Sequence, residues 1–142
     1  MTNKIQSIDF LHDQIITSRT TSPGKYSRSV SINQTDGNFV VTYPLNNSLA
    51  IYPQSPNTTM GRVPLSVVTD LGNFGTLSYP SDAKFDSVRG NIWVADMGNN
   101  RILSLNYASR LIDFEFKGVT FPYILCVNSN NGDVYARGFS DL

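Results

Sequence analysis

The sequence is poor in the residues that usually carry catalysis or cross-linking. It holds one cysteine, one histidine and one glutamate among 142 residues. A single cysteine excludes an internal disulfide framework, and one cysteine with one histidine cannot make an ordinary zinc site. We therefore expect no cofactor and no metal. Charged residues make up only 15% of the chain, well below the ~25% typical of soluble domains.

The chain also lacks an excess of either charge, because 11 basic residues are matched by 11 acidic ones and the formal net charge is zero. The basic residues are scattered along the chain, which argues against nucleic acid as a partner. No stretch approaches the ~20 apolar residues of a membrane helix. The first six residues lack the apolar core of a signal peptide. We expect that the chain does not insert into a membrane. We also expect that it is synthesised in the cytoplasm, and its final location stays open.

Good helix formers are scarce, and short β-branched or aromatic runs alternate with turn clusters instead. Three such runs follow an Asp-Gly, Arg-Gly or Asn-Gly pair, where a left-handed backbone is needed. The runs are 39–43, 92–95 and 134–136, and the turn glycines are Gly37, Gly90 and Gly132. Many short strands with regular turns predict an all-β sandwich, barrel or propeller.

Aligned on the three turn glycines, the chain contains three copies of one unit, with the glycines 53 and 42 residues apart. Ungapped matches extend over the preceding strand, the turn and the following strand. The shared positions before the glycine are an aromatic (Tyr26, Tyr79, Phe121), two alternating apolar residues (Val30 and Ile32, Ala83 and Phe85, Leu125 and Val127) and an amide or carboxylate (Asn33, Asp86, Asn128). Coincidental turns in an ordinary alternating β-protein are the competing interpretation.

Further strands complete the predicted unit. A third strand follows an Asn-Asn turn at 49–52 and again at 102–105, and a fourth candidate lies at 112–114, with 8–10 as an echo. Four strands in ~40–45 residues is the size of a propeller blade. We predict a single domain over 1–142 with units at about 23–64, 65–109 and 110–142, and with 1–22 as an N-terminal strand segment that completes the last blade.

The middle copy, residues 79–105, resembles an NHL repeat, the blade of NHL-type β-propellers. The resemblance rests on Pro80, Asp86, the Gly-Asn pair, Val-Ala-Asp and Asn-Asn-Arg-Ile. It is weaker in the first copy, where Tyr43 and Ser48 replace the Asp and the Arg, and in the third, where Arg137 replaces the Asp. It implies about three four-stranded antiparallel blades of an incomplete propeller or of a fragment of one. A β-sandwich is the alternative fold.

We expect the motif residues to be structural. Asp96 and Arg101 flank a turn and can pair, while Asn99 and Asn100 can bond loop backbone. Asn91 can adopt a left-handed conformation or cap its turn. The full set is Gly37, Gly90, Asn91, Asp96, Asn99, Asn100, Arg101 and Gly132. Ligand contact by these residues is the alternative.

Catalytic chemistry finds little support. His12, the single histidine, is expected on the surface, and Cys126 as a half-buried strand thiol with no histidine placed near it. Metal-dependent lyases and lactonases occur among related propellers, and that resemblance implies histidine or glutamate ligands. This chain offers only His12 and Glu115, neither at a repeat position. We predict no catalytic residues and no enzyme activity within this chain alone.

The longer spacing between the first two copies leaves an insertion at about 53–64. Insertions in repeat proteins map to loops, often on the binding face. The candidate binding-loop residues are Gln54, Asn57, Met60 and Arg62. A neutral extension is the alternative.

These observations favour a non-enzymatic structural and interaction module, a subunit of a larger assembly such as a virion or phage tail. We expect protein partners or self-association, because three units cannot close a ring of 4–8 blades. One alternative is part of a ligand-binding or enzymatic propeller, lyase- or lactonase-like, whose site other chains complete. Another is an RNA-binding NHL domain, for which Arg28 and Arg89 would supply a basic cluster.

Overall fold

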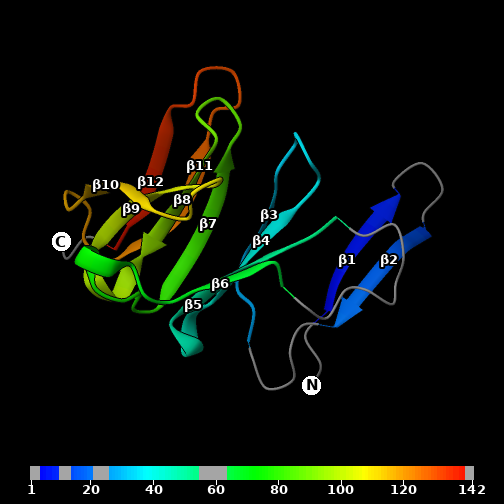
Figure 1. Cartoon of the computed structure of the whole chain (residues 1–142), viewed down its shortest axis with the longest axis horizontal. Helices are drawn as coiled ribbons and strands as arrows, with labels where there is room; N and C mark the ends of the chain where they lie inside the picture. The colour runs from blue at the N-terminus through cyan, green and yellow to red at the C-terminus, as the bar shows by residue number, and fades with distance from the viewer. Residues whose placement is uncertain (1–3, 10–13, 21–25, 55–63, 140–142) are drawn as a thin grey trace.

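The computed structural model describes residues 4–9, 14–20, 26–54 and 64–139, and over these ranges the chain is all-β (Figure 1). Within these ranges the helical pieces are three single turns of 3₁₀ helix, η1 (Pro44–Asn46), η2 (Gly72–Phe74) and η3 (Met97–Asn99). The same ranges hold no helix of the length and apolar character that a membrane crossing needs. The strands are β1 (Lys4–Asp9), β2 (Gln14–Thr20), β3 (Val30–Ile32), β4 (Phe39–Tyr43), β5 (Ser48–Tyr52), β6 (Ser66–Val68), β7 (Pro80–Asp86), β8 (Asn91–Asp96), β9 (Arg101–Asn106), β10 (Ile112–Phe116), β11 (Pro122–Val127) and β12 (Val134–Gly138).

Eight of these strands form two four-stranded antiparallel sheets. The first sheet has the order β3-β4-β5-β6 and the second the order β7-β8-β9-β10, so consecutive strands always pair. The remaining strands form two hairpins, β1–β2 and β11–β12. The predicted all-β class with four-stranded antiparallel units is confirmed by these two sheets. The third copy contains two paired strands within the described residues.

The gap-free alignment of the three copies appears in the structure as a common strand register. In each hairpin, the apolar residue seven positions before the turn glycine lies opposite the residue four positions after it. The Cα partners are Val30 and Val41, Ala83 and Val94, and Leu125 and Ala136. Each turn glycine has a left-handed backbone, with φ of 74° at Gly37, 71° at Gly90 and 75° at Gly132. The glycine prediction is therefore confirmed at all three turns.

The sheets divide the chain differently from the predicted unit boundaries. β6 pairs with β5 and β10 pairs with β9, so each fourth strand closes the preceding sheet. The predicted boundaries at 64/65 and 109/110 therefore separate each fourth strand from its own sheet. In both sheets the fourth strand pairs antiparallel along the free edge of the third strand, which precedes it in the chain.

At the N-terminal side, β1 pairs with β2 along its length. Neither strand is paired with β11 or β12, and Figure 1 shows the β1–β2 hairpin on the side of β3 and β4 opposite to β7. This structure does not show the N-terminal segment completing the last blade.

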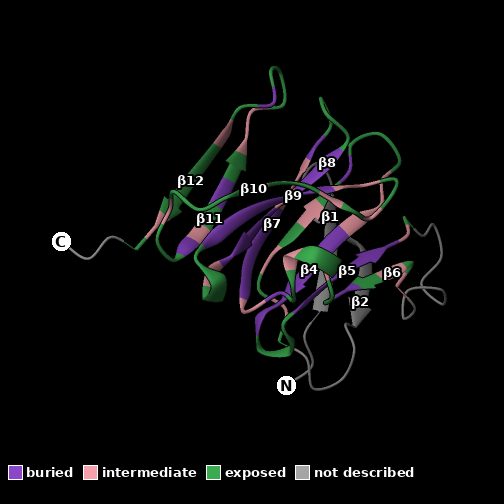
Figure 2. Cartoon of the chain, turned by 60° about the vertical axis from the view of Figure 1, so that its left-hand side comes forward, coloured by how far each residue is buried: buried purple, intermediate pink, exposed green. Residues whose placement is uncertain are grey.

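The two sheets and the β11–β12 hairpin pack face against face in chain order (Figure 2). Between the first and second sheets lies the largest core cluster, built around Val40, Ile51, Ile92 and Leu103, none of them measurably exposed. Between the second sheet and the β11–β12 hairpin lies a smaller cluster of Ala95, Ile102 and Leu125, with Trp93, Val119 and Val134 packed against it. The second sheet thus buries both of its faces, which explains why β8 is apolar on both sides.

The opposite face of the first sheet is buried only in part. Val41, Tyr43, Ala50 and Tyr52 form a third cluster there, and the hydroxyls of Tyr43 and Tyr52 are hydrogen-bonded at 2.6 Å. Val30 and Ile32, on the inner strand β3, remain 48% and 52% exposed. The apolar alternation of β3 does not bury these two side chains, because no described strand covers this end of the face.

Polar side chains link the innermost strands of successive sheets. The hydroxyl of Ser29 accepts a hydrogen bond from the backbone N–H of Ala83 at 3.2 Å, and that of Ser31 from Phe85 at 3.1 Å. At the next interface, the Asp82 carboxylate accepts from the N–H of Leu125 at 2.8 Å. Ser29 and Asp82 occupy aligned positions in their copies. These bonds satisfy backbone donors on strand edges that no neighbouring strand pairs.

Candidate interaction site

Two motif residues, Asp96 at the end of β8 and Arg101 at the start of β9, form a buried ion pair. Arg101 Nε donates to Asp96 Oδ2 at 2.7 Å, as the sequence led us to expect, and Nη1 donates to Glu115 Oε1 at 3.0 Å. The pKa of Arg101 is raised: burial alone would lower it, but the hydrogen bonds and charges of Asp96 and Glu115 outweigh burial. The backbone N–H of Ser78 and the Asn99 amide also donate to Asp96. These contacts hold the β8–β9 turn in place.

Asn100 has a role that reaches beyond its own sheet. It is left-handed, with φ of 52°, and its side-chain oxygen accepts from the N–H of Phe121 at 2.9 Å, just before β11. Asn47, the aligned residue with φ of 49°, accepts from Tyr79 at 2.8 Å, just before β7. The second asparagine of the Asn-Asn turn therefore connects each sheet to the start of the next one.

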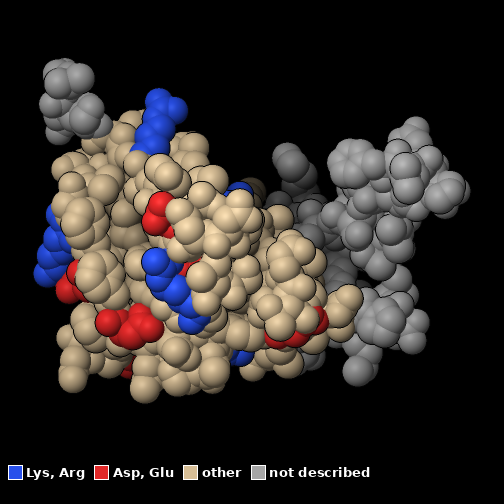
Figure 3. All heavy atoms as spheres, turned by 90° about the horizontal axis from the view of Figure 1, so that it is seen from above, with Lys and Arg blue, Asp and Glu red and all other residues tan. Residues whose placement is uncertain are grey.

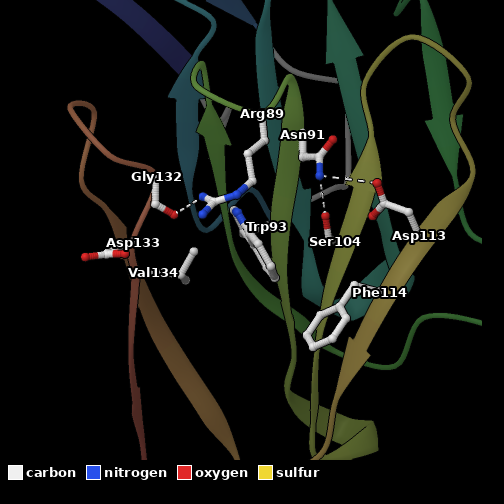
Figure 4. A pocket seen from close by; sticks show the side chains of 9 residues that line it. All are labelled: Arg89, Asn91, Trp93, Ser104, Asp113, Phe114, Gly132, Asp133 and Val134. Atoms are coloured by element: carbon white, nitrogen blue, oxygen red, sulfur yellow. Dashed lines mark hydrogen bonds between the residues drawn. The ribbon is translucent and has the colours of Figure 1, made fainter.

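Of the two turn roles expected for Asn91, a left-handed conformation or a cap, the left-handed conformation is not adopted. It is the first residue of β8, and its amide nitrogen donates to the Ser104 hydroxyl at 2.8 Å and to Asp113 at 3.3 Å (Figure 4). The turn is instead organised by Asp86, whose side chain accepts from the N–H groups of Val88 and Arg89. Asparagines at the aligned positions, Asn33 and Asn128, accept in the same way from Thr35 and Asn130.

Asp86 also ties the second sheet to the β11–β12 hairpin. Its carboxylate accepts from Trp93 Nε1 at 3.2 Å and from Arg89 Nη1 at 3.1 Å, and the same Arg89 nitrogen donates to the Gly132 carbonyl. Burial alone would raise the pKa of Asp86, but the bonds from Trp93 and Arg89 and from the turn backbone lower it. The ionised carboxylate thus orients the indole and the guanidinium.

A cavity of about 510 Å³ opens beside this network, between the second sheet and the β11–β12 hairpin (Figure 4). Its polar end carries the Asn91, Ser104 and Asp113 contacts, and its apolar wall includes Trp93 and Phe114. The two rings meet edge to face with centroids 6.2 Å apart. The lining residues are Arg89, Asn91, Trp93, Ser104, Asp113, Phe114, Gly132, Asp133 and Val134.

A second cavity, of about 300 Å³, shares Trp93, Phe114 and Val134 with the first. Its other lining residues are Ile102, Phe116, Val119 and Ala136. We name the combined depression the β10/β12 groove and define it by Trp93, Ile102, Phe114, Phe116, Val134 and Ala136. Phe114 and Phe116 are 50% and 46% exposed, so the groove offers apolar area that the described residues leave uncovered.

The outward face of the β11–β12 hairpin is also apolar and uncovered. Tyr135 is 61% exposed, whereas the aligned residue Val40 is fully buried and the aligned Trp93 is half-buried. Ile124, on the same face, is 45% exposed. In the other two copies this face packs against the next sheet in the series.

The remaining predicted site residues contribute less. Gln54 lies at the described edge of the predicted binding loop, where its backbone N–H donates to Asn38 Oδ1 at 2.8 Å. Asn57, Met60 and Arg62 lie outside the described residues, and so does His12. Cys126 is exposed rather than half-buried, because it lies on the uncovered face of the hairpin.

The basic residues named for the RNA alternative are engaged within the protein. The Arg28 guanidinium lies over the Tyr123 ring, 4.2 Å from its centroid, and Arg89 pairs with Asp86. On the face in Figure 3, blue and red side chains are interspersed, with no continuous basic area. Among the described residues, no group of three or more His, Cys, Asp and Glu side chains is placed to hold a metal ion.

The groove could not be recognised from the sequence, because its apolar residues occupy strand positions that are typical of a hydrophobic core. Trp93, Phe114 and Val134 all sit at apolar positions of β-strands, and only the assembled sheets reveal that part of their surface is uncovered. A usable signal was present: the third copy matches the repeat only through its second strand, and among the described residues β12 pairs with β11 alone.

Protein-family profiles give no match to this chain, and neither do curated proteins. Among solved structures, the chain resembles the crystal structure of a functionally unknown protein from Desulfotomaculum acetoxidans DSM 771. The TM-score is 0.69 at 16% sequence identity, over 95% of this chain and 41% of that one. The chain thus spans about two fifths of the length of that protein. The likeness establishes a shared fold of antiparallel sheets and leaves function to be argued from the site.

Proposed function

We propose that this protein is a non-enzymatic interaction module built of NHL-like propeller blades, and that it works as a subunit of a larger assembly. The NHL-like motif over 79–105 and the two four-stranded antiparallel sheets support the blade assignment. The docking of each sheet on the next supports a serial, repeat-type architecture, in which one unit buries the face of its neighbour.

The observation that carries the proposal is the uncovered face of the β11–β12 hairpin. Equivalent faces of the first and second sheets are buried by the following unit, with Val40 and Ala95 at 0% exposure. On the hairpin, the same face exposes Ile124 and Tyr135. An apolar face built like two buried ones is suited to bury itself against another sheet of the same kind, and a second copy of the chain can supply that sheet.

Light scattering coupled to size exclusion tests this function. We expect a mass above the 15.7 kDa of one chain that falls towards 15.7 kDa on dilution. The double variant Ile124→Asp/Tyr135→Asp should shift the chain to monomer, because it places two carboxylates on the docking face. Leu45→Asp is the matched control, since Leu45 is 65% exposed in η1, away from that face. A wild-type chain that stays monomeric at every concentration would overturn the proposal.

A further inference from the structure

The edge of β12 that faces away from β11 has no paired strand within the described residues. In the other two sheets the aligned strands β4 and β8 pair on both edges, and their second neighbours are β5 and β9. β5 is buried at every residue and β9 at all but its last. In both four-stranded sheets, the position equivalent to the one beside β12 is therefore filled by a strand that is buried along all or nearly all of its length.

The β10/β12 groove lies under that vacant position. Val134 and Ala136, two residues apart on β12, both face it, and the two cavities follow one another along the strand. Phe114 and Phe116 of β10 line the same groove two residues apart. This spacing matches an extended chain, whose alternate side chains point to one side and repeat every second residue.

We propose that the free edge of β12 and the β10/β12 groove together accept an extended strand from a protein partner, by addition to the sheet. The inference rests on the proposed interaction function and deepens it by naming the chemistry of the partner. The backbone of the added strand pairs with β12, and its alternate apolar side chains fill the groove.

The β8–β9 pairing specifies the partner strand further. Across that pair, Leu105 faces Ile92, Leu103 faces Val94 and Asn106 faces Asn91. Transferred by alignment to β12, the partner carries large aliphatic residues opposite Val134 and Ala136. It carries a polar or basic residue opposite Asp133, where the Asp113 carboxylate also lines the cavity. A strand like β9 antiparallel to β12 meets all three conditions.

Trp93 is the single tryptophan of the chain and lines both cavities, so its fluorescence reports directly on the groove. The experiment titrates a synthetic peptide with the sequence of β9, flanked by solubilising residues, into the full chain. We expect a saturable change in Trp93 emission. A peptide with both leucines replaced by aspartate should bind at least about tenfold more weakly, and so should one N-methylated on its pairing edge.

Two variants on neighbouring residues separate the groove from the outward face. Ala136→Arg places a charged chain in the groove and should weaken peptide binding at least about tenfold. Tyr135→Arg, on the opposite face of the same strand, should leave binding within about twofold. Circular dichroism and thermal unfolding establish that both variants fold before binding is compared.

The outcomes distinguish this inference from the function on which it rests. Concentration-dependent self-association without any peptide-induced change in Trp93 emission overturns the strand acceptor and leaves the interaction module standing. Equal binding to wild type and Ala136→Arg overturns the groove assignment. Equal binding of the N-methylated peptide overturns the backbone pairing. Loss of both self-association and peptide binding overturns both proposals.

Discussion

The side-chain oxygen of Asn100 accepts a hydrogen bond from the backbone N–H of Phe121, 2.9 Å away. Both residues are left-handed, with φ of 52° and 45°, and the pair Asn47 and Tyr79 repeats the arrangement one sheet earlier with φ of 49° and 48°. Two unfavourable backbone conformations are thus held together at each connection. The turn of one sheet and the start of the next are therefore coupled.

Replacing Asn100 should weaken this coupling in two separable steps. Asn100→Gly keeps the left-handed turn but loses the bond to Phe121, and should cost about 1 kcal/mol in the free energy of unfolding. Asn100→Ala adds the left-handed strain of a Cβ and should cost about 2 kcal/mol. Urea denaturation measures both, and Asn47→Gly is the parallel test at the first sheet. Wild-type stability in Asn100→Gly would contradict this account.

Asp86 should make stability depend on pH. Its pKa is lowered from 3.8, so its contribution is complete above the unfolded pKa and is lost as pH falls through the folded value. Asp86→Asn keeps a turn hydrogen bond like that of Asn33 but weakens the contacts to Trp93 and Arg89. It should therefore lower the free energy of unfolding by about 1–2 kcal/mol at pH 7. The difference in unfolding free energy between wild type and Asp86→Asn should shrink as pH falls below 3.8 and through the lower pKa of the folded state. Denaturant unfolding across this range checks the prediction, with the exposed Asp133→Asn as control; a constant gap would refute it.

Replacing only one member of the buried pair Asp96 and Arg101 should strongly lower the free energy of unfolding. Arg101→Met leaves the Asp96 carboxylate, which is fully buried, without its cation and should destabilise by about 3–5 kcal/mol. Adding Asp96→Asn should restore part of this loss, because the uncompensated charge disappears. A double-mutant cycle by thermal or urea unfolding measures the coupling. Additive effects of the two substitutions would rule out the coupling.

Asp82 should control how firmly the β11–β12 hairpin is held. Asp82→Ala removes the acceptor for the Leu125 N–H, so exchange of that amide with solvent should accelerate by about tenfold or more. Ser29→Ala removes the aligned acceptor for Ala83 and is the matched control, because its effect should stay at the first interface. Hydrogen exchange followed by NMR resolves the two amides. An unchanged rate at Leu125 would exclude this role.

The sequence predicted the repeat best where local chemistry dictates structure. The turn glycines Gly37, Gly90 and Gly132 and the register of the three hairpins follow from backbone requirements within about twenty residues. The pairing of Asp96 with Arg101 could likewise be anticipated from two positions flanking one turn.

Features that depend on the assembled sheets could not be predicted in the same way. The short outer strands β6 and β10 carry no local signal for which sheet they join. The inner residues Val30 and Ile32 have the same alternation as Ala83 and Phe85, yet they are exposed because nothing described covers them. The groove at Trp93 arises in the same way, from a position beside β12 that the described strands leave unpaired rather than from a motif. Such properties belong to the packing of distant segments and not to any one stretch of sequence.

The stacking of the sheets in chain order has a consequence for how the molecule opens. The second sheet is supported on both faces, whereas among the described residues the β11–β12 hairpin packs one face on the second sheet and meets the first unit through Arg28 and Tyr123. In a structure whose units contact only adjacent units, stability is close to a sum of local and nearest-neighbour terms. Unfolding need not then be all-or-none: the hairpin frays first, while the double-sided middle sheet is the last cooperative unit to melt.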